Sequence, residues 1–212
     1  MDGNNRWSKI NNIKSYDSYK LGAKKLLNLS YFIFNNYKTI NYISAFALST
    51  HNMKRTKSIL KIIYEVFEYF LDKFPDNKYN YKLKFIGNLN IFSKKIRDKI
   101  SSIEKINSNS KKKLIIFINY SGTSDIINAH KKYIESNTKT IFKIEDFIMT
   151  KGLPNPDILI RSGGFQRLSD YMIFNLTFTE LFFSSKLWPD LKTNDIKKFI
   201  NKYKTIERKF GI

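Results

Sequence analysis

Cysteine is absent from the chain, and histidine occurs only twice. The absence of thiols excludes disulfide bonds and thiolate metal sites, and it fits a reducing compartment. His51 and His130 are too far apart in the sequence to suggest a shared metal site. Metal centres built on cysteine or histidine are therefore not expected.

Long apolar runs are also absent, because no window reaches the roughly 18 uninterrupted apolar residues of a transmembrane helix. The residues after Met1 do not form a signal-peptide pattern. With only 4 prolines and 8 glycines, the chain has no Pro- or Gly-rich linker. We therefore expect residues 1–212, of which 42% are hydrophobic, to form one globular domain.

Acidic residues are few: 18 Asp and Glu stand against 38 Lys and Arg, which gives a formal net charge of +20. One interpretation is an anionic partner, such as a diphosphate or an acidic membrane face. The other is codon usage in an AT-rich genome, since Lys, Asn, Ile, Tyr and Phe are all abundant. The lysines are scattered and no nucleic-acid-binding motif is present, so we expect no nucleic-acid partner.

Helical patterns and short apolar runs alternate along the chain. The helical patterns predict helices over residues 16–36, 55–74, 91–106, 124–136 and 193–208. The apolar runs predict strands over residues 40–48, 81–86, 114–119, 157–160 and 181–183. This alternation is typical of an α/β domain with a largely parallel sheet, whose ligands lie beyond the carboxyl ends of the strands. The turn after Ile160 and the segment after Leu48 are therefore candidate sites.

The turn after Ile160 is rich in arginine and glycine. Arg161, Arg167 and Ser169 surround a Gly-Gly pair at residues 163–164. Glycine lets the backbone approach an anion closely, and each guanidinium group can bind two phosphate oxygens. The segment predicts a diphosphate site; the alternative is a loop of ordinary surface arginines.

The first residues of the chain offer a carboxylate, Asp2, and a nearby arginine, Arg6, on either side of Gly3. A hard divalent cation needs such a carboxylate, and a second diphosphate needs such an arginine. The alternative is a solvated N-terminal aspartate. Together with the arginine-rich turn, this segment indicates phosphate chemistry with a metal.

These two segments resemble the cis-prenyltransferases, of which bacterial undecaprenyl diphosphate synthase, an isoprenyl transferase, is the best-known member. Residues 1–7 resemble the Met-Asp-Gly-Asn-x-Arg-Trp block that opens the catalytic core of the family. Residues 157–169 resemble the family's Asp-Leu-x-Ile-Arg-x-(Ser/Gly)-Gly-Glu-x-Arg-x-Ser block. Weaker matches follow the family's order at residues 49–55, 119–122, 180–183, 187–190 and 207–211. The resemblance implies a single α/β domain with a largely parallel central sheet flanked by helices.

The resemblance also implies a role for each matching residue. The residues implied in catalysis are Asp2 and Asn4, and those implied in binding the allylic diphosphate are Gly3, Asn4 and Arg6. The residues implied in binding isopentenyl diphosphate are Arg161, Arg167 and Ser169. Asp2 and Glu180 are implied as ligands of Mg²⁺, although Glu180 could also be an ordinary helix end. The apolar positions of 21–34 and 55–74 resemble the walls of the product tunnel, or they are ordinary core.

The implied reaction is the condensation of isopentenyl diphosphate with an allylic diphosphate, expected to be farnesyl diphosphate. The product would be a cis-polyprenyl diphosphate such as undecaprenyl diphosphate, a lipid carrier for cell-wall glycans. The implied assembly is a homodimer in the cytoplasm, with peripheral contact at the inner face of the membrane for product release. The C-terminal residues 208–211 would reach toward the active site of the neighbouring subunit.

Several positions depart from the family's pattern, namely Asn5, His51, Met53, Thr123 and Phe165. Phe165, for example, follows the Gly-Gly pair where the family has Glu. These departures put affinity and rate in doubt more than the type of reaction, because Asp2, Arg161 and Arg167 are retained. They motivate an alternative function, a catalytically weak or silent subunit that binds a lipid.

The resemblance further implies an element that has no residues here. In the family an apolar strand runs directly into the Met-Asp-Gly-Asn block, whereas Met1 is the first residue of this sequence. Loss of a central strand would expose two neighbouring strands as edges. It would also leave Asp2 on a fraying terminus beside a positively charged amino group. We therefore expect either a start upstream of Met1 or an unstable, weakly active protein.

Overall fold

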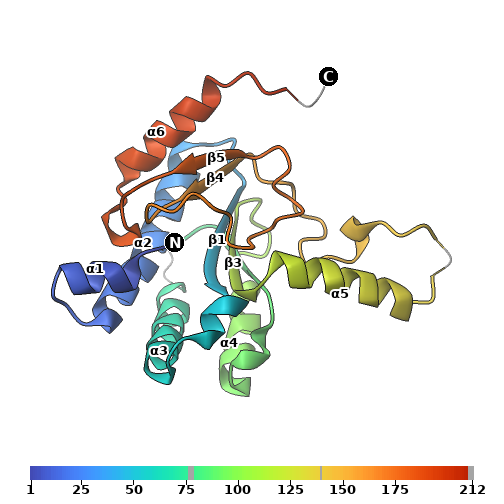
Figure 1. Cartoon of the computed structure of the whole chain (residues 1–212), viewed down its shortest axis with the longest axis horizontal. Coiled ribbons are helices and arrows are strands. Elements are labelled where there is room, and N and C mark those ends of the chain that lie inside the picture. Colours follow the sequence, from blue (N-terminus) through green and yellow to red (C-terminus); the bar gives the residue numbers. More distant parts are fainter. Residues whose placement is uncertain (76–78, 139, 210–212) are drawn as a thin grey trace.

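The computed structural model of the protein describes residues 1–75, 79–138 and 140–209. It confirms the α/β class: parallel strands lie at the centre, and helices flank them (Figure 1). Helix α5 (Gly122–Glu135) projects from this body and forms an arm together with the segment that follows it (Figure 1). Among the helices of the described ranges, none combines the length and the apolar character that crossing a membrane requires.

All five predicted strands form, and every strand pair in the described part of the chain is parallel. The strands are β1 (Tyr42–Ser49), β2 (Lys82–Ile86), β3 (Lys113–Tyr120), β4 (Ile158–Arg161) and β5 (Glu180–Phe183). Strand β3 is buried on both faces: Leu114 and Ile116 contact one apolar cluster, and Ile115 and Phe117 contact the other. This alternation of successive side chains makes β3 the central strand of its sheet.

The single central sheet expected from the sequence is divided in this structure. One sheet has the order β1-β3-β2, and the other consists of β4 and β5. Within the described residues, one edge of β1 and one edge of β4 have no strand partner, and residues of both strands line the same cavity. The expectation of a further strand before Asp2 stays a prediction.

The predicted helices also form. They are α2 (Ser15–Asn36), α3 (Lys57–Lys73), α4 (Lys94–Glu104), α5 and α6 (Thr193–Lys204). The structure adds α1 (Asn4–Ile10), which the sequence does not predict because its 7 residues are too few to show a helical period. Helix α1 begins directly after Gly3, so it fixes the direction of the N-terminal segment.

Several helix ends differ from prediction: α4, for example, spans Lys94–Glu104 and is shorter than the predicted 91–106. Helix α5 begins at Gly122, because the Ser121 hydroxyl caps it by accepting a hydrogen bond from the Ser124 amide at 3.1 Å. Helix α6 ends at Lys204, where the Thr205 hydroxyl donates to the Lys202 carbonyl at 2.8 Å and competes with a further helical turn. The predicted helix 193–208 is therefore too long.

Candidate active site

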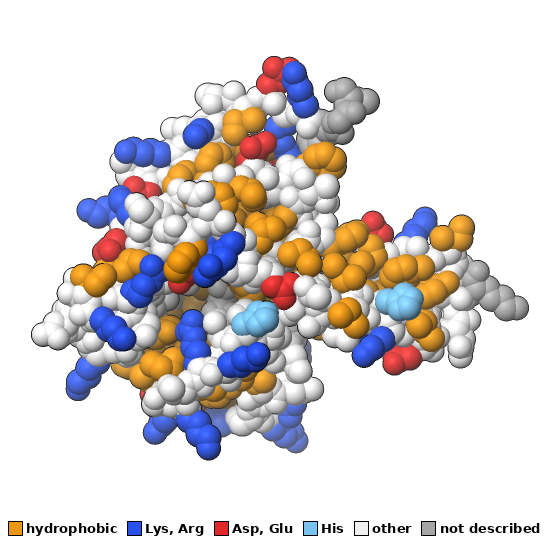
Figure 2. Space-filling model, in the orientation of Figure 1, with side chains coloured by type: hydrophobic (Ala, Val, Ile, Leu, Met, Phe, Trp, Pro, Cys, Tyr) orange, Lys and Arg blue, Asp and Glu red, His pale blue; other side chains and the backbone are white. Residues whose placement is uncertain are grey.

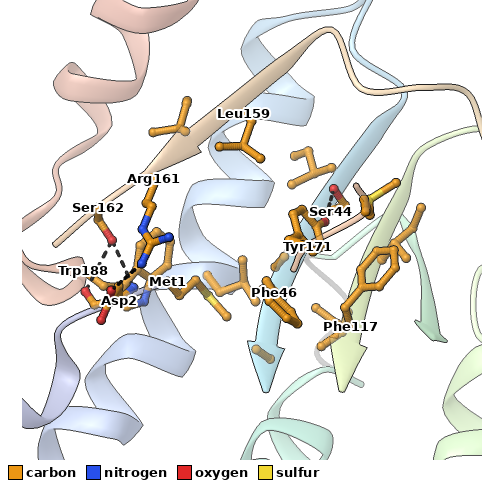
Figure 3. A pocket seen from close by; sticks show the side chains of 18 of the residues that line it. Met1, Asp2, Ser44, Phe46, Phe117, Leu159, Arg161, Ser162, Tyr171 and Trp188 are labelled. Carbon is orange, nitrogen blue, oxygen red and sulfur yellow. Dashed lines mark hydrogen bonds and ion pairs between the residues drawn. The ribbon is translucent and has the colours of Figure 1, made fainter. Parts of the chain in front are cut away.

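A cavity of about 1410 Å³ lies between the two sheets and the N-terminal helices. Figure 3 shows its two ends: Asp2, Arg161 and Ser162 lie together at one end, and Phe46 and Tyr171 lie toward the other. The polar end lies at the carboxyl end of β4, where the sequence predicted a site. We call this end the polar mouth, defined by residues 1–6 and 161–169.

The carboxylate of Asp2 joins the two predicted diphosphate segments. Its Oδ2 atom lies 3.2 Å from Nη2 of Arg161, and its Oδ1 atom lies 3.6 Å from Nη2 of Arg6. The backbone of Asp2 is held as well: its amide donates to Ser162 Oγ at 3.2 Å, and its carbonyl accepts from the Trp188 amide at 2.9 Å. Asp2 is therefore held through both its side chain and its backbone.

Two glycines permit this close approach. Gly163 has φ +95°, and a Cβ atom there would lie 2.8 Å from Nη2 of Arg6 and 3.0 Å from Cβ of Asp2. Gly3 has φ +100°, and a Cβ atom there would lie 2.7 Å from a side-chain carbon of Leu187. Both positions have a left-handed backbone that favours glycine, and a side chain at either would force Arg6 or Leu187 to shift. Glycine at these positions lets the N-terminal segment and the loop after β4 meet.

The predicted isopentenyl diphosphate residues also come together. Nη1 of Arg161 donates to Ser169 Oγ at 2.8 Å and to the backbone carbonyl of Arg167. Nη2 of Arg6 donates to the Gly163 carbonyl at 2.7 Å, so the two predicted diphosphate segments share one polar surface. Nε of Arg161 is buried without a partner among the described residues. A buried donor without a partner is costly, so a ligand acceptor here would be favourable.

Asp170 was not singled out from the sequence, yet it fixes the loop that carries Ser169. Its Oδ1 atom accepts from the amide and the hydroxyl of Thr123, each at 2.8 Å, and its Oδ2 atom accepts from Ser121 Oγ. Burial alone would raise the pKa of Asp170, but these hydrogen bonds outweigh it and lower the pKa below its usual value. The departure Thr123 therefore has a structural role. The signal in the sequence that could have indicated Asp170 is its place directly after the block of residues 157–169.

The side chain of Asn4 packs against helix α2, and its oxygen atom is buried there. A Cβ atom on Gly22 would lie 2.5 Å from its Oδ1 atom, so Gly22 leaves room for this amide. Oδ1 of Asn4 is buried without a hydrogen-bond partner in the described part of the chain. Asn4 lines the cavity with Gly3 and Arg6, as the prediction for the allylic diphosphate requires.

Glu180 does not come together with Asp2 within the chain. Glu180 pairs with Ile158 at the beginning of the β4–β5 ladder, whereas Arg161, which contacts Asp2, pairs with Phe183 at its end. Three residues of a strand span about 10 Å. Strand register thus places Glu180 at the end of the β4–β5 ladder away from the residue that contacts Asp2. That Asp2 and Glu180 hold one metal stays a prediction.

Among the described residues, no group of three His, Cys, Asp or Glu side chains could hold a metal ion. In the described part of the chain, Asp2 is the carboxylate that forms ion pairs with arginines of the mouth. Mg²⁺ is commonly held by one or two carboxylates together with substrate phosphates and water. The donor set of the mouth therefore fits a Mg²⁺ ion that shares its ligands with a bound diphosphate.

The α-amino group of Met1 lies beside this carboxylate. Burial lowers its pKa to about 6, although the neighbouring charge of Asp2 opposes the shift. Burial therefore weakens the positive charge that the sequence led us to expect beside the carboxylate of Asp2.

The rest of the cavity wall is apolar. Helix α2 contributes Leu29 and Ile33, helix α3 contributes Phe67 and Phe70, and β1 contributes Leu48. We call this the apolar wall, defined by the cavity-lining residues of α2, α3 and β1. Helices α2 and α3 pack against each other, so the predicted tunnel helices do lie together at the cavity.

The C-terminal prediction is only partly within the structure. Arg208 forms an ion pair with Asp157 of its own chain at 2.7 Å and donates to the Phe178 carbonyl at 3.0 Å. Phe210 and Gly211 lie outside the described residues. The reach of residues 208–211 toward a neighbouring subunit stays a prediction.

Comparison with known proteins places the chain in a family. Residues 1–211 match the Prenyltransf family model, which describes undecaprenyl diphosphate synthases. The tritrans,polycis-undecaprenyl-diphosphate synthase (geranylgeranyl-diphosphate specific) of Pyrobaculum aerophilum is 31% identical, and the match covers 99% of this chain and 92% of that protein. The isoprenyl transferase of Rickettsia typhi is 32% identical, with 100% and 95% covered.

A solved structure extends the likeness to the fold. The crystal structure of lavandulyl diphosphate synthase from Lavandula x intermedia, in complex with dimethylallyl diphosphate, has a TM-score of 0.89 to this chain at 25% identity. That likeness covers 100% of this chain and 95% of the other. The chain belongs to the cis-prenyltransferase family, whose members transfer prenyl groups.

Proposed function

We propose that the protein condenses isopentenyl diphosphate with an allylic diphosphate to make a cis-polyprenyl diphosphate and inorganic pyrophosphate. The observation that carries this proposal is the position of Asp2, held between Arg6 and Arg161 at the polar mouth of a largely apolar cavity. A diphosphate can lie in the mouth while its prenyl chain extends along the apolar wall. Charge and hydrophobicity are thus separated as they are in an allylic diphosphate.

In the proposed reaction, the bond between the allylic carbon and its diphosphate oxygen breaks, and the electron pair leaves with the oxygen. The double bond of isopentenyl diphosphate attacks that carbon, and loss of a proton then leaves a new cis double bond. Arg6 and Asn4, with the backbone at Gly3, are proposed to hold the allylic diphosphate. Negative charge grows on its oxygens as the bond breaks, so a fixed guanidinium group stabilises the transition state.

Arg161, Arg167 and Ser169 are proposed to hold isopentenyl diphosphate. Arg161 already contacts Ser169 and Asp2, so it links the two diphosphate positions. Because guanidinium groups stay charged and bind two oxygens at once, they fix the orientation of the attacking substrate as well as its position. The work assigned to these residues is alignment of the two reacting carbons.

Mg²⁺ is the proposed cofactor, with Asp2 as its protein ligand. When bound, such an ion supplies Lewis-acid stabilisation of a leaving diphosphate. Asp2 now forms ion pairs with two arginines. Binding of a diphosphate would give those arginines other anionic partners and free the carboxylate for the cation.

We further propose farnesyl diphosphate as the allylic substrate and undecaprenyl diphosphate, a lipid carrier for cell-wall glycans, as the product. The volume of the cavity, about 1410 Å³, supports this proposal because it leaves room for a long prenyl chain. The relatives differ on this point: the Pyrobaculum protein is described as specific for geranylgeranyl diphosphate, and the Lavandula structure holds dimethylallyl diphosphate. Product analysis with each allylic diphosphate will therefore decide the substrate.

A homodimer in the cytoplasm, with peripheral contact at the inner face of the membrane, is part of the proposal. The α5 arm presents apolar side chains to solvent (Figure 2), with Ile127 51% exposed and Ile134 59% exposed. Exposed apolar patches of this kind are typical of protein or membrane contacts. Light scattering at micromolar concentration should give twice the 25.1 kDa mass of the chain; a monomer would contradict the dimer.

The proposed function is tested by incubating the protein with farnesyl diphosphate, labelled isopentenyl diphosphate and Mg²⁺, followed by lipid extraction. Labelled polyprenyl diphosphate should form, and EDTA should abolish it. Failure of the wild-type protein to form product with any allylic diphosphate would contradict the proposal.

The second candidate function is a catalytically silent subunit that binds a lipid in the same cavity. The apolar wall would serve it equally well, and the departures at Asn5, His51 and Phe165 favour it. The same assay separates the two candidates. A silent subunit would retain a prenyl lipid in a binding assay and release no inorganic pyrophosphate.

A further inference from the structure

The side chain of Phe165 lies at the centre of the polar mouth. Its ring centroid is 4.2 Å from the guanidinium carbon of Arg167, 5.0 Å from that of Arg6 and 5.8 Å from that of Arg161. Each distance is within the range of a cation–π interaction. One ring therefore contacts arginines from both proposed diphosphate segments.

The ring matters because these arginines repel one another. Arg6 and Arg161 share the single carboxylate of Asp2. None of the carboxylates in the described ranges forms an ion pair with Arg167, whose guanidinium carbon is the nearest of the three to the ring. An aromatic face attracts cations through its quadrupole and carries no net charge. The ring can thus gather the guanidinium groups without neutralising any of them.

We propose that Phe165 is a positioning residue that holds Arg6, Arg161 and Arg167 as one preorganised cluster for diphosphate. The inference rests on the proposed function, because it deepens the account of the same site. Gly164, which precedes Phe165, has φ +83°, and a Cβ atom there would meet no atom within 4 Å. Its amide donates to the Ser184 carbonyl at 2.9 Å, which fixes the turn that carries the ring. The ring is 41% exposed, so its role is not that of a core residue.

A carboxylate at position 165 would behave differently. It would also attract the guanidinium groups, but it would cancel part of their charge and compete with an incoming diphosphate. With phenylalanine, the anion meets the full charge of the cluster, and its binding should depend more steeply on salt. The identity of residue 165 is therefore expected to set affinity for the diphosphate group and not the length of the prenyl chain.

The test measures binding of inorganic pyrophosphate by calorimetry, in EDTA and at two salt concentrations. The variants are Phe165→Leu, which removes the ring, Phe165→Tyr, which keeps it, and Phe165→Glu. The matched control is Phe178→Leu, since Phe178 is an exposed phenylalanine, 54% exposed, outside the cavity lining. Thermal unfolding of each variant shows whether the fold is retained, and Phe165→Glu tests the loss of the ring if Phe165→Leu does not fold.

We expect Phe165→Leu to weaken pyrophosphate binding by about three- to tenfold, the effect of losing one to two cation–π contacts. Phe165→Tyr and Phe178→Leu should stay within about twofold of the wild type. Phe165→Glu should bind more weakly and with a shallower salt dependence, because its site carries less net charge.

Equal binding by Phe165→Leu and the wild type would overturn the inference, and so would an equal loss in Phe165→Leu and Phe165→Tyr. The proposed function can fail separately. If pyrophosphate binding depends on the ring but no prenyl product forms, only the proposed function is contradicted. If product forms and the ring is irrelevant to binding, only this inference is contradicted; absence of pyrophosphate binding by the wild type contradicts both.

Discussion

The polar mouth and the apolar wall of the cavity are built in different ways. The mouth joins residues that are 159 positions apart, Asp2 and Arg161, through ion pairs and backbone hydrogen bonds. The wall is formed by periodic apolar positions of α2 and α3, two helices that pack side by side. The mouth therefore depends on a few long-range polar contacts, whereas the wall depends on many interchangeable apolar ones. We expect single substitutions to affect chemistry at the mouth and product length at the wall.

Replacing the carboxylate of the mouth should have the largest effect. Asp2→Ala should lower the turnover number by about a hundredfold or more, because it removes the proposed metal ligand and the bridge between Arg6 and Arg161. Product formation per minute, at saturating substrates and Mg²⁺, measures the change. The control is Asp17→Ala, since Asp17 is an exposed aspartate in the first turn of α2. Near-normal turnover in Asp2→Ala would show that the mouth is not the reaction centre.

The next effect should distinguish the two diphosphate positions. Arg167→Ala should raise KM for isopentenyl diphosphate by about one to two powers of ten, the value of one charged hydrogen bond. KM for the allylic diphosphate should change little. Arg97→Ala, at a position of α4 outside the cavity lining, is the control. If both KM values rose equally, the assignment of the two positions would be wrong.

A smaller effect, on the free energy of unfolding, should show how the loop that carries Ser169 is held. Hydrogen bonds keep the pKa of Asp170 in the folded protein below its usual value. As the pH falls from the usual pKa of an aspartate toward this lower pKa, the unfolded chain therefore binds more protons than the folded one. The stabilisation is thus complete at neutral pH and lost in acid. Asp170→Asn should cost about 1 kcal/mol of unfolding free energy at pH 7, as for loss of a helix cap.

The difference between Asp170→Asn and the wild type should shrink as pH falls below about 4. Urea unfolding at both pH values measures it. A difference that stayed constant with pH would mean that the charge of Asp170 does not carry the stabilisation. Thr123→Val removes one donor to the same carboxylate and should give part of the effect at neutral pH.

The smallest effect on rate, and the clearest effect on product, should come from the wall. Ile33→Phe narrows the cavity next to α2 and should shift products to shorter chains. The rate of the first condensation should stay within about threefold of the wild type, because the mouth is unchanged. Ile127→Phe, on the outer side of the α5 arm, is the control. Unchanged product length in Ile33→Phe would place the prenyl chain elsewhere.

The same division explains how much the sequence could predict. Periodicity predicted α2, α3 and the five strands, because apolar burial has a fixed spacing in each kind of element. It could not predict α1, which is short, or the contact of Asp170 with Thr123, which depends on loop geometry. The resemblance to a family indicated Asp2, Arg6, Arg161, Arg167 and Ser169, and the structure brings these residues together.

Two features of the structure do not follow from the order of motifs in the sequence. Glu180 and Asp2 both belong to matching blocks, yet Glu180 lies at the beginning of the β4–β5 ladder and Arg161, which contacts Asp2, lies at its end. The order of strands predicted the parallel pairing that the structure confirms, but its division into β1-β3-β2 and β4-β5 depends on which edges meet in space. Motif order along a chain does not determine distance between motifs.

The most direct test of the account measures rate and product length together. Pyrophosphate release and the chain-length distribution should be recorded in the same reactions, at low and at saturating isopentenyl diphosphate, for the wild type, Arg167→Ala and Ile33→Phe. We predict that Arg167→Ala changes the rate at low substrate but not the distribution, and that Ile33→Phe shortens the products with little change in rate. Rate and product length changing together in both variants would contradict the separation of mouth and wall.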